Sequence, residues 1–160
     1  MRYEEVFREL NSGGVKYLTV GGIALILHDI VRFTADLDLM VELSEDNLTK
    51  LVATMEKMGY KPRVPVKASD FIDPRKREKW IREKNMKVFS FYDPKRPTHL
   101  VDIFVDEPID FDEAYSRKKT FKVDDFEIPV VSLEDLKRLK LLSGREQDIL
   151  DIKELERLEK

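Results

Sequence analysis

Three aspartates lie in segments that otherwise have the pattern of buried β-strands, where aspartate is disfavoured. Asp36 and Asp38 belong to the segment Ala35–Leu43, and Asp102 belongs to the segment Leu100–Val105. Side chains alternate along a strand, so Asp36 and Asp38 share one face while apolar residues occupy the other. If the two strands are neighbours, the three carboxylates converge. An isolated Asp-x-Asp pair is more often the solvated face of an edge strand. A second feature is needed to favour a functional carboxylate cluster over this interpretation.

The second feature is the pair Gly21-Gly22, which follows the strand-like segment Val15–Val20 and precedes the apolar segment Ile23–Asp29, typical of a short buried helix. Glycines at such a junction let the backbone turn tightly and approach a ligand, because they have no Cβ. The first N–H groups of the helix are also suited to bind phosphate. By itself a Gly-Gly pair is usually only a turn. Together with the carboxylates it indicates a site for phosphoryl chemistry.

The whole chain alternates helical and strand-like patterns. Helices are predicted over Glu4–Leu10, Ile23–Asp29, Glu45–Met58, Pro74–Lys84, Phe111–Arg117, Ser132–Gly144 and from Arg145 onward, and strands over Val15–Val20, Ala35–Leu43, Met86–Tyr92, Leu100–Val105, Thr120–Val123 and Phe126–Val131. This order predicts one α/β (α+β) domain over residues 1–160, in which a mixed β-sheet is flanked by helices and ends in a C-terminal helical pair.

The composition limits which metals the site can hold. The chain has no cysteine and only two histidines, which excludes disulfides, thiolate metal sites and a cysteine nucleophile and leaves little for zinc. Carboxylate oxygens instead favour Mg²⁺ or Mn²⁺. No run approaches the ~20 apolar residues of a membrane span, and the N-terminus lacks a signal-peptide core, so we expect a soluble, cytoplasmic protein. The many Lys, Glu and Arg residues, with a single Gln, resemble thermophile composition.

The formal net charge of −3 hides a basic region. Between Lys61 and Arg96 the chain has 12 Lys and Arg residues against 5 Asp and Glu residues, which suits attraction of a polyanion. Within it, the basic segment 75–84 could bind RNA through phosphate contacts, with Trp80 stacking on a base. Such a run is more often a solvated helix face with its tryptophan in the core.

For His28, on an apolar helix, we expect a packed or capping role.

The spacing of the glycines and aspartates resembles one known superfamily. Gly21-Gly22, thirteen intervening residues, Asp36-Leu37-Asp38 and a later strand with Asp102 are similar to the pattern of the DNA polymerase beta-like nucleotidyltransferases. The stretch 32–38, Arg-Phe-Thr-Ala-Asp-Leu-Asp, resembles the Arg-x-Thr-x-Asp-x-Asp stretch of the stand-alone bacterial and archaeal members, including the abortive-infection toxin-like and antitoxin-associated groups. The Gly-Gly form, in place of Gly-Ser, lacks a hydroxyl that is often placed on the phosphates.

The C-terminal residues carry the same resemblance. Lys140 and the segment 144–151, which contains Arg145, Asp148 and Asp151, are similar to the Lys and Arg-x-x-Asp positions near the end of those groups. Lys140 could equally decorate a helix, and the two aspartates could be salt-bridge partners or solvated positions. The resemblance covers residues 21–151, although the middle third has no diagnostic residue.

The resemblance implies Mg²⁺-dependent transfer of an NMP from an NTP. Asp36 and Asp38 would hold two Mg²⁺ ions, and Asp102 would complete the second ion and take the acceptor's proton. The nucleotide itself would contact the two glycines and four polar residues. These residues are Gly21, Gly22, Arg32, Thr34, Lys140 and Arg145. For Arg32, a structural pair with an acid is the competing interpretation.

The acceptor is not specified by the sequence and could be a protein, an RNA or a small molecule. Two other functions stay open. One is a non-catalytic nucleotide-binding or toxin-antitoxin partner module that keeps the acids without turnover. The other is a metal-dependent phosphohydrolase that uses the same acids on water. Because small members of the superfamily often act with a partner chain, a partner chain or a homo-oligomer is a further expectation.

Overall fold

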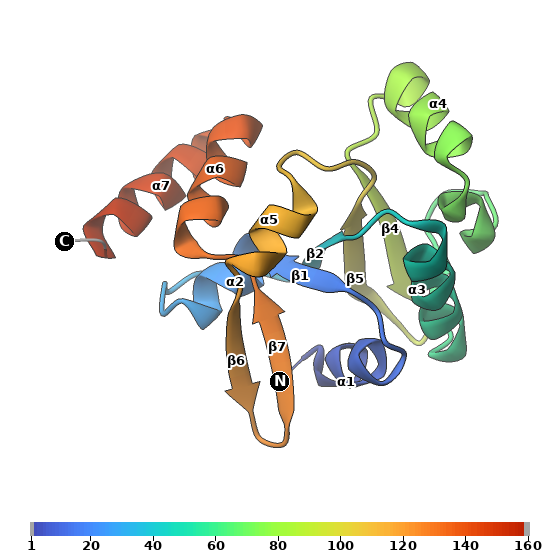
Figure 1. The fold of residues 1–160 in the computed structure, drawn as a ribbon, viewed down its shortest axis with the longest axis horizontal. Helices are drawn as coiled ribbons and strands as arrows, with labels where there is room; N and C mark the ends of the chain where they lie inside the picture. Colours follow the sequence, from blue (N-terminus) through green and yellow to red (C-terminus); the bar gives the residue numbers. More distant parts are fainter. Residues whose placement is uncertain (1, 159–160) are drawn as a thin grey trace.

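The computed structural model describes residues 2–158, and a seven-stranded mixed sheet forms its centre, with the strand order β3-β4-β5-β2-β1-β7-β6 (Figure 1). The elements are α1 (Glu4–Ser12), β1 (Tyr17–Val20), α2 (Gly21–Leu27), β2 (Leu37–Val41), α3 (Glu45–Lys57), β3 (Lys61–Pro62), a 3₁₀ helix η1 (Ala68–Ile72), α4 (Pro74–Lys84), β4 (Val88–Asp93), β5 (Arg96–Phe104), α5 (Phe111–Ser116), β6 (Lys119–Val123), β7 (Phe126–Val130), α6 (Leu133–Ser143) and α7 (Glu146–Leu158).

The sheet combines parallel and antiparallel pairs. β2 pairs with β5 and β1 with β7 in parallel, whereas the remaining neighbours are antiparallel. α6 and α7 pack against each other at the C-terminus (Figure 1). The prediction of an α/β fold with a mixed sheet, flanking helices and a C-terminal helical pair is therefore confirmed. The single-domain assignment stays a prediction.

Two boundaries next to the glycines and aspartates differ from the sequence prediction. β2 begins at Leu37 rather than at Ala35, so Asp36 lies just before the strand. The ladder explains this, because the first pair of β2 with β5 is Leu37 with Val101. α2 begins at Gly21 itself rather than at Ile23.

The hairpin β4–β5 is longer than predicted. Its second strand starts at Arg96, because the side chain of Asp93 accepts hydrogen bonds from the backbone N–H of Lys95 (3.0 Å) and from Nε of Arg96 (3.2 Å). These contacts close a short turn where a longer one was expected. β3 and η1, which lie between α3 and α4, have no counterpart in the prediction.

The tryptophan of the basic segment lies in the core. Trp80 is buried, and its ring stacks on Phe89 with 5.3 Å between the ring centroids. Arg77 is also buried and donates hydrogen bonds to the carbonyl oxygens of Phe71 and Ile72. The core interpretation of Trp80 is confirmed, and its ring is not free to stack on a base. In residues 2–158, no helix combines the length and the hydropathy that a membrane crossing requires.

The helix α3 is fixed to the sheet by one buried amide. Asn47 accepts from the backbone N–H of Lys16 (2.7 Å) and donates to the carbonyl oxygens of Lys16 (2.9 Å) and Glu42 (2.8 Å). Its own backbone N–H is capped by the hydroxyl of Ser44. The side chain therefore ties the start of α3 to the residue before β1 and the residue after β2, at the end of this strand pair that is opposite Val20 and Asp38.

We expect Asn47→Ala to lower the free energy of unfolding by about 2–3 kcal/mol, because it leaves buried backbone groups unpaired. Thr49→Ala is the control, since the Thr49 hydroxyl is exposed and bonds only within its own helix. Urea denaturation followed by circular dichroism measures both variants. Equal midpoints for the two variants would contradict the assigned role of Asn47.

His28 is packed, as expected, rather than free to bind a ligand. It caps the end of α2, Nε2–H donates to the carbonyl oxygen of Val131 (2.9 Å), and the ring makes an edge contact with Phe121. Burial lowers the pKa of His28 below its usual value, and the hydrogen bond to Val131 opposes this only in part. The folded protein therefore favours the neutral ring more strongly than the unfolded chain does.

This pKa shift gives stability a defined pH dependence. The unfolded chain binds the extra proton at a higher pH than the folded protein, so the contribution of His28 to stability is complete above about pH 6.5 and decreases on acidification. We expect His28→Gln to lose less stability than wild type between about pH 7.5 and pH 5 in urea titrations. Identical losses in the two proteins would refute this.

Candidate active site

Four neighbouring strands place Ser90, Asp102, Asp38 and Val20 in one row across the sheet. Ser90 of β4 pairs with Asp102 of β5, Asp102 pairs with Asp38 of β2, and Asp38 pairs with Val20 of β1. Side chains of directly paired residues project from the same face, so the two carboxylates lie side by side. The predicted neighbourhood of the two strands is confirmed, and the row ends beside the diglycine.

Gly21 is in close contact with the first of these carboxylates. Its φ angle is +68°, and a Cβ at this position would lie 2.2 Å from Oδ2 of Asp38. A Cβ on Gly22 would lie 2.6 Å from the hydroxyl oxygen of Thr34. The junction therefore requires glycine at both positions. Gly21 is required by its positive φ angle and by the nearby Asp38 carboxylate, and Gly22 is required by the nearby Thr34 side chain. The Asp38 carboxylate and the Thr34 hydroxyl occupy the places that side chains at positions 21 and 22 would take.

Both aspartates of the row have a raised pKa, and burial is the main cause for each. Burial raises the pKa of Asp38 to about 7, and repulsion from Asp102 and Asp36 adds to the shift. Burial also raises the pKa of Asp102, although the hydrogen bond from the Ser90 hydroxyl (2.6 Å) opposes this. A cation placed between the carboxylates would reverse both shifts.

Asp36 lies close enough to join this electrostatic cluster without being part of the strand. Its charge raises the pKa of both Asp38 and Asp102. The preceding residue, Ala35, is anchored because its carbonyl oxygen accepts a hydrogen bond from the hydroxyl of Tyr3. Across the part of the chain that the structure describes, no three or more His, Cys, Asp or Glu side chains are placed as a group that could hold a metal ion, and Asp36, Asp38 and Asp102 are included in this.

Lys140 and Arg145 bring positive charge to the same region. Both lower the pKa of Asp38 through electrostatic attraction. Lys140 is only 5% exposed, and its Nζ lies 3.3 Å from Asp148 and 2.9 Å from Asp151. Arg145 donates from Nε to Asp148 at 2.8 Å. The alternative in which Lys140 merely decorates a helix surface is therefore wrong, and both aspartates of α7 are salt-bridge partners.

Arg32 and Thr34 approach the site from the loop between α2 and β2. Arg32 forms an ion pair with Asp151, so the interpretation of Arg32 as the partner of an acid is confirmed. Thr34 lies against Gly22 and donates a long hydrogen bond (3.4 Å) to the carbonyl oxygen of Asp36. The fold thus gathers the predicted site residues around the C-terminal end of β1 and the N-terminal end of β2.

Sequence reasoning missed Ser90 and Tyr3. Ser90 is a polar residue in the strand Val88–Asp93, on the face opposite the buried Phe89 and Phe91. A correct register for the hairpin would have placed it opposite Asp102. No local pattern identifies Tyr3, because its contact with Ala35 joins the first helix to a loop 32 residues away.

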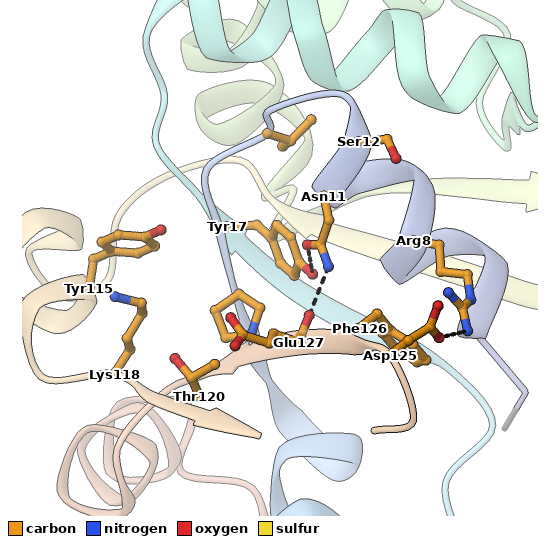
Figure 2. A pocket seen from close by; sticks show the side chains of 12 residues that line it. Arg8, Asn11, Ser12, Tyr17, Tyr115, Lys118, Thr120, Asp125, Phe126 and Glu127 are labelled. Carbon is orange, nitrogen blue, oxygen red and sulfur yellow. Dashed lines mark hydrogen bonds and ion pairs between the residues drawn. The ribbon is translucent and has the colours of Figure 1, made fainter. Parts of the chain in front are cut away.

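A surface cavity of about 510 Å³ lies elsewhere, between α1 and the β6–β7 hairpin (Figure 2). In it, Asn11 accepts a hydrogen bond from the hydroxyl of Tyr17 and donates one to the carbonyl oxygen of Glu127. Arg8 pairs with Asp125 at its rim. None of the residues predicted for the site lines this cavity, so the two features are separate.

Solved structures with a similar fold are nucleotidyltransferases or resemble them. The lincosamide antibiotic adenylyltransferase LnuA, in its lincomycin-bound form, matches with a TM-score of 0.58 at 18% identity over 96% of this chain and 95% of that chain. The Thermotoga maritima protein TM1012, a candidate nucleotidyltransferase, matches with 0.59 at 14% identity over 96% and 89%. An antigenic nucleotidyltransferase-like protein from Paracoccidioides brasiliensis matches with 0.56 at 19% identity over 96% and 72%.

At these identities the structural matches show the fold alone, and no curated protein sequence matches the chain. The family is shown by a sequence model instead. The model described as nucleotidyl transferase AbiEii toxin, type IV toxin-antitoxin system, matches residues 19–157, which include the diglycine, the three aspartates and the C-terminal cations. The chain therefore belongs to the AbiEii family of nucleotidyltransferases.

Proposed function

We propose that the protein transfers an NMP from a Mg²⁺-bound NTP to a hydroxyl-bearing acceptor, and that Asp36, Asp38 and Asp102 carry the reaction. The observation that supports this most directly is the pairing of Asp38 with Asp102 on adjacent strands, next to a glycine against which the Asp38 carboxylate packs. Nucleotidyl transfer needs mainly charge neutralisation and in-line positioning. The residues at the ends of β1 and β2 can supply both.

The carboxylates fit a magnesium or manganese ion by their chemistry. Mg²⁺ is usually held by one or two carboxylates together with substrate phosphates, rather than by a complete cage of protein ligands. Asp38 and Asp102 would supply the first ligands, with Asp36 beside them. When bound, such an ion neutralises triphosphate charge and lowers the pKa of an acceptor hydroxyl. The charge of the ion would also offset the repulsion from Asp102 and Asp36 that adds to the effect of burial on the pKa of Asp38.

The other residues would bind and orient the nucleotide. Gly21 and Gly22 would let the triphosphate approach the main chain, and Thr34 would face it from the loop. Lys140 and Arg145 would neutralise charge that develops as the pyrophosphate leaves. The hydroxyl oxygen of the acceptor would attack the α-phosphorus, and its proton would pass to Asp102, whose second oxygen is held by Ser90.

Family membership and fold similarity bear on the partner and the acceptor. The type IV toxin-antitoxin description of the family supports an antitoxin as a functional partner of this protein. The fold match with an adenylyltransferase for lincosamide antibiotics makes small hydroxylated molecules candidates for the acceptor, beside RNA and protein. Production of pyrophosphate rather than inorganic phosphate from an NTP would separate the transferase from a phosphohydrolase.

We expect Asp38→Asn to reduce NMP transfer by more than about 100-fold, because it removes a charge that holds the cation. The assay measures incorporation of α-labelled NTP into a panel of RNA, protein and hydroxylated small molecules, with pyrophosphate release as a second signal. Asp124→Asn is the matched control, since Asp124 lies in the β6–β7 turn with a φ of +52° that asparagine adopts readily. Equal transfer by the two variants would overturn the role of Asp38.

We expect Gly21→Ala to lose at least about 10-fold in transfer, because its Cβ would displace the Asp38 carboxylate. Gly14→Ala provides a close control. Its φ is +69°, nearly that of Gly21, but nothing lies within 4 Å of its Cβ position. Both variants should lose about 1 kcal/mol of stability from backbone strain, whereas only the first should lose activity. If Gly21→Ala kept the activity of Gly14→Ala, close contact at the diglycine would be irrelevant to catalysis.

A further inference from the structure

One carboxylate joins three separate parts of the chain at the edge of the site. Asp151 of α7 is only 4% exposed, and its Oδ2 accepts from both Arg32 and Lys140, the latter at 2.9 Å. Its other oxygen accepts from the side-chain amide of Gln147 at 3.0 Å. Arg32 lies in the loop before β2, and Lys140 lies on α6. Asp151 therefore links that loop to both C-terminal helices.

The loop has little apolar packing at this point. Val31 is fully exposed and Phe33 is 89% exposed, so the residues on either side of Arg32 make no contribution to the core. The same loop continues to Thr34, which lies against Gly22, and to Asp36. Because each residue extends the chain by at most about 3.5 Å, a fixed Arg32 limits where the next residues can lie.

We propose that Asp151 is a positioning residue, which holds the Arg32 loop and Lys140 together at one edge of the nucleotide site without contacting the nucleotide. This inference rests on the proposed function for the kinetic effect, but the tether itself does not. Buried ion pairs with several hydrogen bonds fix geometry, and removal of one partner leaves the others without compensation. Asp148 differs, because it also accepts from the backbone N–H of Arg145 at the start of α7.

A purely electrostatic role for Asp151 would have the opposite effect on nucleotide binding. Asp151 is an anion next to Lys140, so if only its charge mattered, its removal would strengthen the attraction of a triphosphate. If Asp151 positions the loop, its removal weakens binding and slows transfer, because Thr34 and Asp36 lose their fixed places. The sign of the change in KM therefore separates the two roles.

The experiment compares Asp151→Asn with Asp135→Asn. Asp135 is a fully buried carboxylate on α6 that accepts from Arg117 at 3.0 Å through both oxygens, and its ion-pair partners are Arg117 and Arg138 rather than residues assigned to the site. Both variants should lower the melting temperature. We expect only Asp151→Asn to raise the KM for NTP by about fivefold or more and to lower kcat by about 10-fold or more. A lower KM in Asp151→Asn would overturn the proposal.

Trypsin cleavage after Arg32 tests the tether without any activity. Release of Arg32 should raise the cleavage rate at the Arg32–Phe33 bond at least about fivefold in Asp151→Asn, but not in Asp135→Asn. An unchanged rate in Asp151→Asn would refute the tether. Faster cleavage of Asp151→Asn, together with a wild-type protein that neither binds nor transfers nucleotide, would refute only the proposed function. If Asp151→Asn does not fold, Arg32→Gln breaks the ion pair with Asp151 from the side of the loop. This variant should reproduce the rise in KM and the fall in kcat. Unchanged kinetics in Arg32→Gln would refute the proposal.

Discussion

The repulsion between the carboxylates of Asp38 and Asp102 is the constraint on which the site depends. The ladder between β2 and β5 sets these residues directly opposite each other, and burial in the sheet deprives them of water. In isolation, such a pair would favour protonation or separation of the strands. The surrounding chain tolerates it because Lys140 and Arg145 contribute compensating charge and Ser90 donates a hydrogen bond.

That compensation depends on a second set of charges. Lys140 is buried, and a buried ammonium is stable only with close anionic partners. Asp148 and Asp151 provide them, and donors that include Arg145 and Lys140 outweigh burial to keep the pKa of Asp148 well below its usual range. The C-terminal helical pair is thus coupled to the aspartate row by charge as well as by packing. A cation that entered the row would ease the repulsion on which this balance depends.

Local patterns predicted much of the fold, because alternation of apolar residues and the positions of glycine report directly on strands and turns. Strand parity predicted the face on which Asp38 lies, but its meeting with Asp102 was conditional on the two strands being neighbours, which the ladder of β2 with β5 shows. The exact start of β2 was missed because pairing with β5, not local preference, makes the strand begin at Leu37, after Asp36. The bond of Arg32 with Asp151 spans 119 residues, and only the assembled fold determines it.

The distinction between backbone pairing and loop contacts also explains why the reaction is easier to infer than the acceptor. The aspartate row is set by backbone pairing, which tolerates wide sequence change, and the fold is shared with proteins of only 14–19% identity. The Arg32 loop, by contrast, lies outside the paired strands, and its side chains Val31 and Phe33 are exposed. Loops vary more freely than paired strands, so one catalytic row can serve different acceptors. In the proposed reaction, acceptor choice would therefore lie in contacts that the sheet does not fix, and the proposed tether at Asp151 would set where the Arg32 loop presents them.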